Sequence, residues 1–207
     1  MKGLYLLALG ASLLLGLAGS AVAQTSADAA ASTRIQEKFR RMELLNLTLP
    51  VLMTQKQIKG MLPLIEKSRK ADQDLKAKEA AILKSLEADC DTAIKNGTTK
   101  RMVVPSPVMQ KLQINIQGMT MARQLMVQEH LGAMVAYVKA NLDASQQKVC
   151  AGLISASWIN PLEPDKVTDD QKLNFWVANV ILDPLCYSLL VEMAKVAPAE
   201  PEGGSGQ

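Results

Sequence analysis

The side chains in this sequence best suited to chemistry are sulfur groups and one imidazole at helical spacing. Met126, His130 and Met134 stand four residues apart, so an α-helix would carry them on one face, and Met119 lies seven residues before Met126. Thioether and imidazole groups suit Cu(I), which makes Met126, His130 and Met134 a candidate copper or silver site. The same spacing is also typical of an apolar seam between two helices, because Met fills cores readily.

A third interpretation of the methionines is an adaptable binding surface. Flexible Met side chains repack against different partners, which suits a surface that holds apolar segments of other proteins. On this interpretation the contact residues are Met109, Met119, Met126 and Met134. The sequence leaves the metal site, the seam and the binding surface open as alternatives.

No catalytic set accompanies these residues. The chain has 1 His, and it lacks the G-x-S-x-G, P-loop, H-E-x-x-H and C-x-x-C patterns. Since no acid, base and nucleophile can be grouped from the sequence, we expect no enzyme. Apart from the candidate copper, we expect no cofactor.

The composition indicates a globular, helical protein. The 207 residues are 48% hydrophobic and 21% charged with a net charge of +3, too apolar for a disordered chain and too balanced for a nucleic-acid binder. Aromatic residues make up 3%, so the core must rest on aliphatic side chains and Met, which favours helices over a β-sandwich.

The start of the chain has the parts of a cleaved secretory signal. Lys2 precedes an apolar run that ends at Ala21-Val22-Ala23, an A-x-A cleavage site. Glycines and serines interrupt this run, whereas a retained membrane anchor needs about 20 apolar residues. We therefore expect cleavage after residue 23, a periplasmic or secreted protein, and no stable membrane span after cleavage.

Export brings the three cysteines into a compartment where disulfides persist. Three is an odd number, so at most one internal bond can form. We predict a bond between Cys150 and Cys186, because both lie in the apolar C-terminal third. Spacing alone leaves the two other pairings with Cys90 open.

Three expected helix starts share a short motif. In each, an apolar residue precedes a Thr or Asp, and a Gln follows three positions later. This pattern is a capping box, in which the Thr or Asp side chain accepts from the backbone N–H of the Gln while the Gln side chain reaches back to the cap residue. The pairs are Thr54 with Gln57, Asp143 with Gln146, and Thr168 with Gln171.

The recurrence of this motif in an exported, helical chain resembles the periplasmic LTxxQ-motif proteins, the Spy/CpxP family. The resemblance covers about residues 44–147, with Met53 and Val167 in place of Leu and Asp143 in place of Thr. It implies a curved hairpin of long helices that often dimerises, with an envelope-stress or ATP-independent chaperone role. It implies no catalytic residues.

Hydrophobic periodicity and helix signals predict an all-α fold in which a long antiparallel helical hairpin carries additional short helices. After a flexible leader (24–31), one helical domain spans 32–196 and a disordered tail follows (197–207). The apolar stretch 175–191 is expected to be a buried core helix, and the sequence leaves open whether 158–195 cover the groove of the hairpin. The expected helices span about 33–46, 54–96, 106–141, 144–158 and 169–195, the last with a kink at Pro184.

These observations favour an exported binding protein that holds apolar segments of unfolded clients, as a homodimer. A metal-binding or metal-sensing protein and a purely structural envelope protein are the alternatives. Neither nucleic acid nor a membrane is an expected partner.

Overall fold

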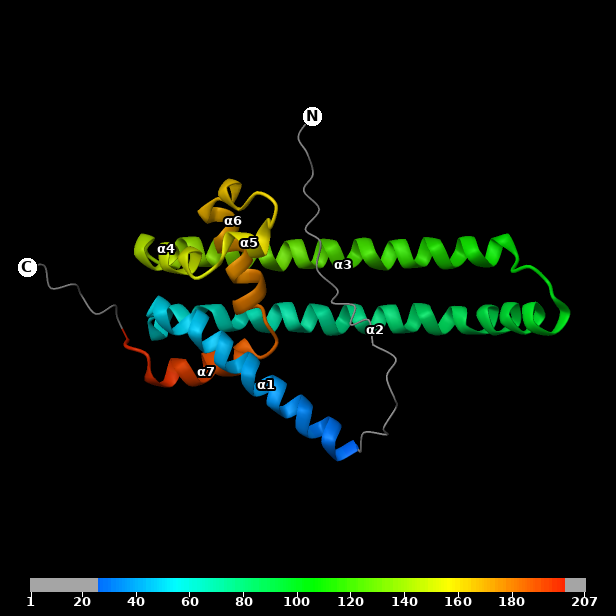
Figure 1. The fold of residues 1–207 in the computed structure, drawn as a ribbon, viewed down its shortest axis with the longest axis horizontal. Helices are drawn as coiled ribbons and strands as arrows, with labels where there is room; N and C mark the ends of the chain where they lie inside the picture. Colours follow the sequence, from blue (N-terminus) through cyan, green and yellow to red (C-terminus); the bar gives the residue numbers. More distant parts are fainter. Residues whose placement is uncertain (1–25, 200–207) are drawn as a thin grey trace, which may run out of the picture. The chain divides into compact units, whose positions relative to one another are not determined.

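The computed structural model describes residues 26–199, which are helical and contain no strand (Figure 1). The predicted all-α class is therefore confirmed. Among the described residues, 26–37 and 38–199 belong to two separate units. The predicted domain 32–196 falls in the second unit from residue 38 onward.

Helix α1 (Ser26–Thr48) begins in the first unit and ends in the second. It starts before the expected helix 33–46 and so includes residues 26–31 of the predicted leader. Alanines fill much of this stretch, and alanine has the highest helix propensity. The predicted signal peptide, residues 1–23, and residues 200–207 of the predicted tail lie outside the described residues.

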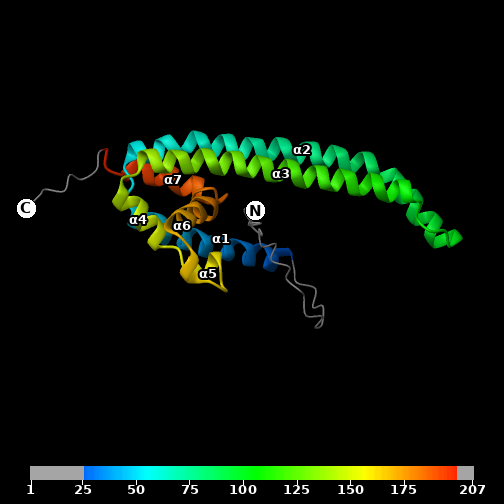
Figure 2. The same cartoon turned by 90° about the horizontal axis from the view of Figure 1, so that it is seen from above.

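Helices α2 (Gln55–Lys100) and α3 (Ser106–Asn141) run side by side in opposite directions (Figures 1 and 2). The predicted long hairpin is thus confirmed. Helix α2 stays one helix through Pro63, and it continues one turn past the expected stop at Gly97 to a C-cap at Arg101, where φ is 52°.

One glycine lets the two long helices approach closely. A Cβ atom at Gly60 would lie 1.9 Å from the hydroxyl oxygen of Tyr137, so any larger residue collides with that ring. The Tyr137 hydroxyl donates to the backbone oxygen of Gln57 over 3.0 Å. This contact ties the last turns of α3 to the first turn of α2.

The C-terminal part is more broken than expected. The predicted helix 144–158 divides into α4 (Ala144–Gly152) and α5 (Ala156–Ile159). The predicted helix 169–195 divides into α6 (Asp169–Trp176), a π-helical turn labelled η3 (Val177–Ile181) and α7 (Cys186–Val196). Short 3-10 turns, η1 (Leu49–Val51) and η2 (Pro164–Lys166), complete the chain.

Pro184 lies between η3 and α7. The segment Asp169–Ile181, which comprises α6 and η3, meets α7 at a bend of 93°. Within residues 26–199, no single helix has both the length and the hydropathy to span a membrane, although this bent pair meets the test jointly. Its inner side chains are buried in the protein core, as predicted for 175–191.

The core lies at the end of the hairpin where α2 begins and α3 ends. Helix α7 packs on α2, while α6 and η3 pack on α3. The indole nitrogen of the fully buried Trp176 donates to the backbone oxygen of Leu47 over 2.8 Å. Pro198, in the predicted tail 197–207, accepts a hydrogen bond of 2.8 Å from the backbone nitrogen of Gln55.

Candidate functional site: the distal half of the hairpin

All three predicted capping boxes are present. The Thr54 hydroxyl accepts from the backbone nitrogen of Gln57 over 3.2 Å, and the Gln57 side chain accepts from the backbone nitrogen of Thr54 over 2.8 Å. Asp143 with Gln146 and Thr168 with Gln171 repeat this reciprocal pattern. The motif therefore fixes where α2, α4 and α6 begin.

Two of the three boxes are joined side by side. The Gln57 amide donates to the Gln146 side-chain oxygen over 2.8 Å, and Gln146 donates back over 3.1 Å. Gln146 is buried and also donates to the backbone oxygen of Val51 over 3.2 Å, while Gln57 donates to that of Asn141 over 2.8 Å. The pair thus pins the start of α2 to the α3–α4 turn.

The predicted methionine face is divided along its length. Met134 is fully buried in the core, Met119 and Met126 are half-buried, and Met109 is 55% exposed. The expectation that all four contact a client is therefore wrong for Met134. The core lies at the end of the hairpin that carries Met134, so Met134 is buried there. Met109 lies near the other end of α3, where no core covers it.

The candidate metal residues lie on this same seam. His130 is buried on α3 next to the buried Met134, and Met126 precedes it on the same face. Their burial agrees with the interpretation as an apolar seam. Over residues 26–199, no group of three or more His, Cys, Asp or Glu side chains has the arrangement of a metal site.

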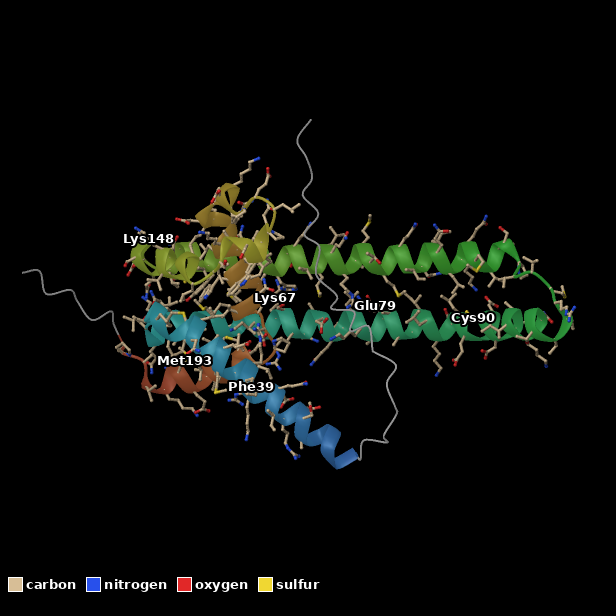
Figure 3. All side chains as sticks on the ribbon, in the orientation of Figure 1. Phe39, Lys67, Glu79, Cys90, Lys148 and Met193 are labelled. Atoms are coloured by element: carbon tan, nitrogen blue, oxygen red, sulfur yellow. The ribbon has the colours of Figure 1, made fainter. Side chains whose placement is uncertain are left out.

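The exposed part of the hairpin lies beyond the core. We call residues 79–125 the distal half. Here α2 buries only Glu79, Leu86 and Ala93, and α3 buries no side chain before His130. Figure 3 labels Glu79 and Cys90 on this stretch of α2, where α3 is its neighbour and the short helices lie at the other end of the hairpin.

One face of the distal half is apolar and accessible. Leu83, Cys90 and Ile94 are spaced by seven and four residues along α2, so they share one helical face. Leu83 and Cys90 of this face line a hollow of about 380 Å³ together with Leu112 of α3. We call this hollow and the apolar side chains one turn along the same helix faces the distal groove. Its apolar lining is Leu83, Leu86, Cys90 and Leu112, and Ile94, Met109 and Ile116 extend it by helical spacing. Leu83, Ile94, Met109 and Ile116 are each more than half exposed.

Polar side chains of both signs accompany the groove. Lys84 and Glu87 line it from α2. Asp89 of α2 pairs with Lys111 of α3 over 2.7 Å, and the buried Glu79 carboxylate accepts from the Arg123 guanidinium. The groove therefore joins an apolar floor to a border without a dominant charge, which suits uncharged apolar ligands better than strongly charged ones.

Comparison with known proteins identifies no relative of this chain. No protein-family model, no curated protein and no solved structure matches the chain. The function is therefore argued from the residues themselves, with the distal groove as an accessible apolar surface that both long helices form.

The cysteines differ from the expectation. Cys150 and Cys186 are both buried and free, as is the half-buried Cys90, so the predicted Cys150–Cys186 disulfide is wrong. Each of the two buried thiols packs in the core as a small apolar group. Burial raises the pKa of each to about 12, which keeps the thiol protonated and unreactive.

Sequence reasoning missed three features of this region. The Gln57–Gln146 pair joins residues 89 positions apart, which no local pattern reveals. The π-helical turn Val177–Ile181 has no clear sequence signal. The groove residues of α2 are apolar positions at helical spacing in the sequence. Which of them stay exposed depends on how far the short helices cover the hairpin, and the sequence does not show this.

Proposed function

We propose that this protein is an exported, ATP-independent binding protein that holds apolar segments of unfolded proteins in the distal groove. The observation that carries the proposal is the exposure of apolar side chains on both helices of the distal half, although a packed core is available at the other end. Monomeric proteins seldom expose contiguous apolar surface without a binding role.

Further support comes from the sequence. The recurring Thr/Asp-x-x-Gln starts resemble the LTxxQ motif, and that resemblance implies a chaperone or envelope-stress role and a homodimer. The secretory signal predicted for residues 1–23 supports a periplasmic or secreted location. The proposal needs no catalytic group, because holding a client requires only reversible burial of its apolar side chains.

The groove composition fits such clients. Met109 brings a flexible thioether, and Leu83, Ile94 and Ile116 bring branched aliphatic groups. This mixture can repack against different apolar sequences. The mixed charges of Lys84 and Glu87 favour no single client charge.

The experiment is light scattering of an aggregating model client with the purified chain and without ATP. One variant changes the groove: Leu83→Ser, Ile94→Ser, Met109→Ser and Ile116→Ser. A matched control changes exposed apolar residues at a spacing that puts them on the opposite side of α3: Ile114→Ser, Met121→Ser and Leu125→Ser.

We expect wild type and the control to suppress scattering at a near-equimolar ratio and the groove variant to lose suppression, with equal helicity in all three. Equal suppression by the groove variant would contradict the proposal. Repeating the assay with Cu(I) and with a chelator tests the sulfur site, because suppression only with metal would make Met126, His130 and Met134 a switch. Sedimentation equilibrium tests the proposed homodimer.

A further inference from the structure

A second hollow lies among the short helices, away from the distal groove. Its volume is about 480 Å³, within the range of small-molecule sites. Its deepest lining comes from Ile154 before α5 and Val180 of the π-helical turn, both buried, with the half-buried Leu47 of α1 beside them. We call it the aromatic pocket, because two of the protein's few aromatic side chains form its walls.

These walls are Trp158 and Phe175. Trp158 is 58% exposed although it borders an apolar hollow, and Phe175 is half-buried. Flat aromatic rings pack most favourably against other rings, in offset or edge-to-face arrangements. The walls therefore favour a planar aromatic ligand over an aliphatic one.

The charged residues of the pocket are already paired. The Arg40 guanidinium lies 2.9 Å from the Asp183 carboxylate and 3.1 Å from that of Glu43. It also donates to the backbone oxygen of Asn179 over 2.7 Å. One Arg40 guanidinium faces the carboxylates of both Asp183 and Glu43, so this group disfavours an anionic ligand. The Glu43 side chain is 63% exposed, so solvent screens its charge and it attracts a cationic ligand only weakly. The pocket therefore suits an uncharged ligand.

The pocket also offers side-chain amide groups to a ligand. Asn46 lines the pocket, and its side-chain amide has no hydrogen-bond partner among residues 26–199. An amide offers both a donor and an acceptor. Asn179 also lines the pocket, from the π-helical turn, a rare element that is frequent at functional sites.

We propose that the aromatic pocket binds an uncharged planar aromatic group that carries one hydrogen-bonding atom, the chemistry shared by indole and phenols. The ring lies between Trp158 and Phe175 over the aliphatic floor, and its polar atom meets the Asn46 amide. Such a group occurs both as a free small molecule and as a side chain of a peptide.

The probe is 5-fluoroindole, followed by fluorine NMR with the full chain. We expect its resonance to broaden and shift on addition of wild-type protein. Trp158→Ala should weaken binding at least tenfold, and Asn46→Trp, at an exposed helix position, should abolish it by filling the pocket. Trp158→Phe retains a ring and should retain most of the binding. Leu162→Ala is the matched control, because this exposed side chain lies outside the pocket lining.

Competition tests the chemical class. Unlabelled indole and p-cresol should displace the probe, whereas tryptamine, indole-3-acetate and cyclohexanol should need at least tenfold higher concentrations. N-acetyltryptophan amide separates the two sources: tighter binding than indole supports a peptide side chain, and weaker binding supports a free small molecule.

The proposal is overturned if the probe resonance does not change with millimolar wild-type protein. It is also overturned if Trp158→Ala and Asn46→Trp bind as wild type does, since the probe would then bind elsewhere. Equal displacement by the charged analogues or by cyclohexanol would contradict the ligand class.

Discussion

Replacing Gly60 with alanine should destabilise the protein, although the same change stabilises most helices by about 1 kcal/mol. The new methyl carbon would lie 1.9 Å from the Tyr137 hydroxyl oxygen and 2.6 Å from the ring carbon Cζ, so the ring must move. That movement breaks the hydrogen bond from Tyr137 to the Gln57 backbone oxygen. The ring has little room to move, because Tyr137 packs against the hydrophobic core.

The magnitude follows from these contacts. The lost hydrogen bond costs about 1 kcal/mol, and overpacking costs about 1–3 kcal/mol. After the helix-propensity gain of about 1 kcal/mol, the free energy of unfolding should fall by about 1–3 kcal/mol. In a Tyr137→Ala background the same change should instead raise it by about 1 kcal/mol, which gives a coupling of about 2–4 kcal/mol.

Urea unfolding followed by circular dichroism at 222 nm measures all four members of this cycle. Gly118→Ala is the matched control, because nothing lies within 4 Å of a Cβ atom built there. It should stabilise the protein. If Gly60→Ala were as stabilising as Gly118→Ala, or if the cycle showed no coupling, the close approach of α2 and α3 at Gly60 would be refuted.

Three further predictions concern the capping boxes and the cysteines. Gln146→Ala should lower the free energy of unfolding by about 2–4 kcal/mol, because it leaves buried backbone and amide groups without partners. Gln171→Ala, in the exposed capping box of α6, should lower it by only about 0.5–1 kcal/mol. Equal losses of stability in urea unfolding would contradict the joining of the Thr54 and Asp143 capping boxes. Burial raises the pKa of Cys150 and Cys186 from 9.0 to about 12, so above pH 9 the unfolded chain loses thiol protons that the folded protein keeps. Stability should then fall with rising pH by up to about 1.4 kcal/mol per pH unit for each thiol, and a Cys150→Ala, Cys186→Ala variant should show a shallower fall between pH 9 and 11. Native alkylation followed by mass spectrometry should label Cys90 first; simultaneous labelling of all three would contradict the burial.

The sequence predicted the elements that depend on local signals. Capping boxes mark the starts of α2, α4 and α6, because the cap and its Gln lie within one turn of each other. The hairpin followed from two long periodic segments joined by a short loop. KLQINIQ at 111–117 alternates as a strand would, yet it is helical, because its flanks on both sides are helical.

The remaining features depend on contacts between distant residues. Met134 and Met109 have the same residue type and share one face of α3, yet only the helices that cover the proximal end bury Met134. Cys150 and Cys186 fall in one core without bonding, because burial in an apolar cluster does not require a pair. The aromatic pocket likewise brings together α1, α5 and α6, which no periodic pattern connects.

The absence of buried side chains from Ser106 to Glu129 of α3 has a consequence for native-state hydrogen exchange. Amide protection depends on the free energy of local opening, and a two-helix segment with a narrow seam opens without unfolding the core. Exchange should therefore follow a gradient, fast near the α2–α3 turn and slow from His130 onward. A client held in the distal groove would slow exchange in the fast segment selectively, so protection of these amides would report occupancy of the groove residue by residue.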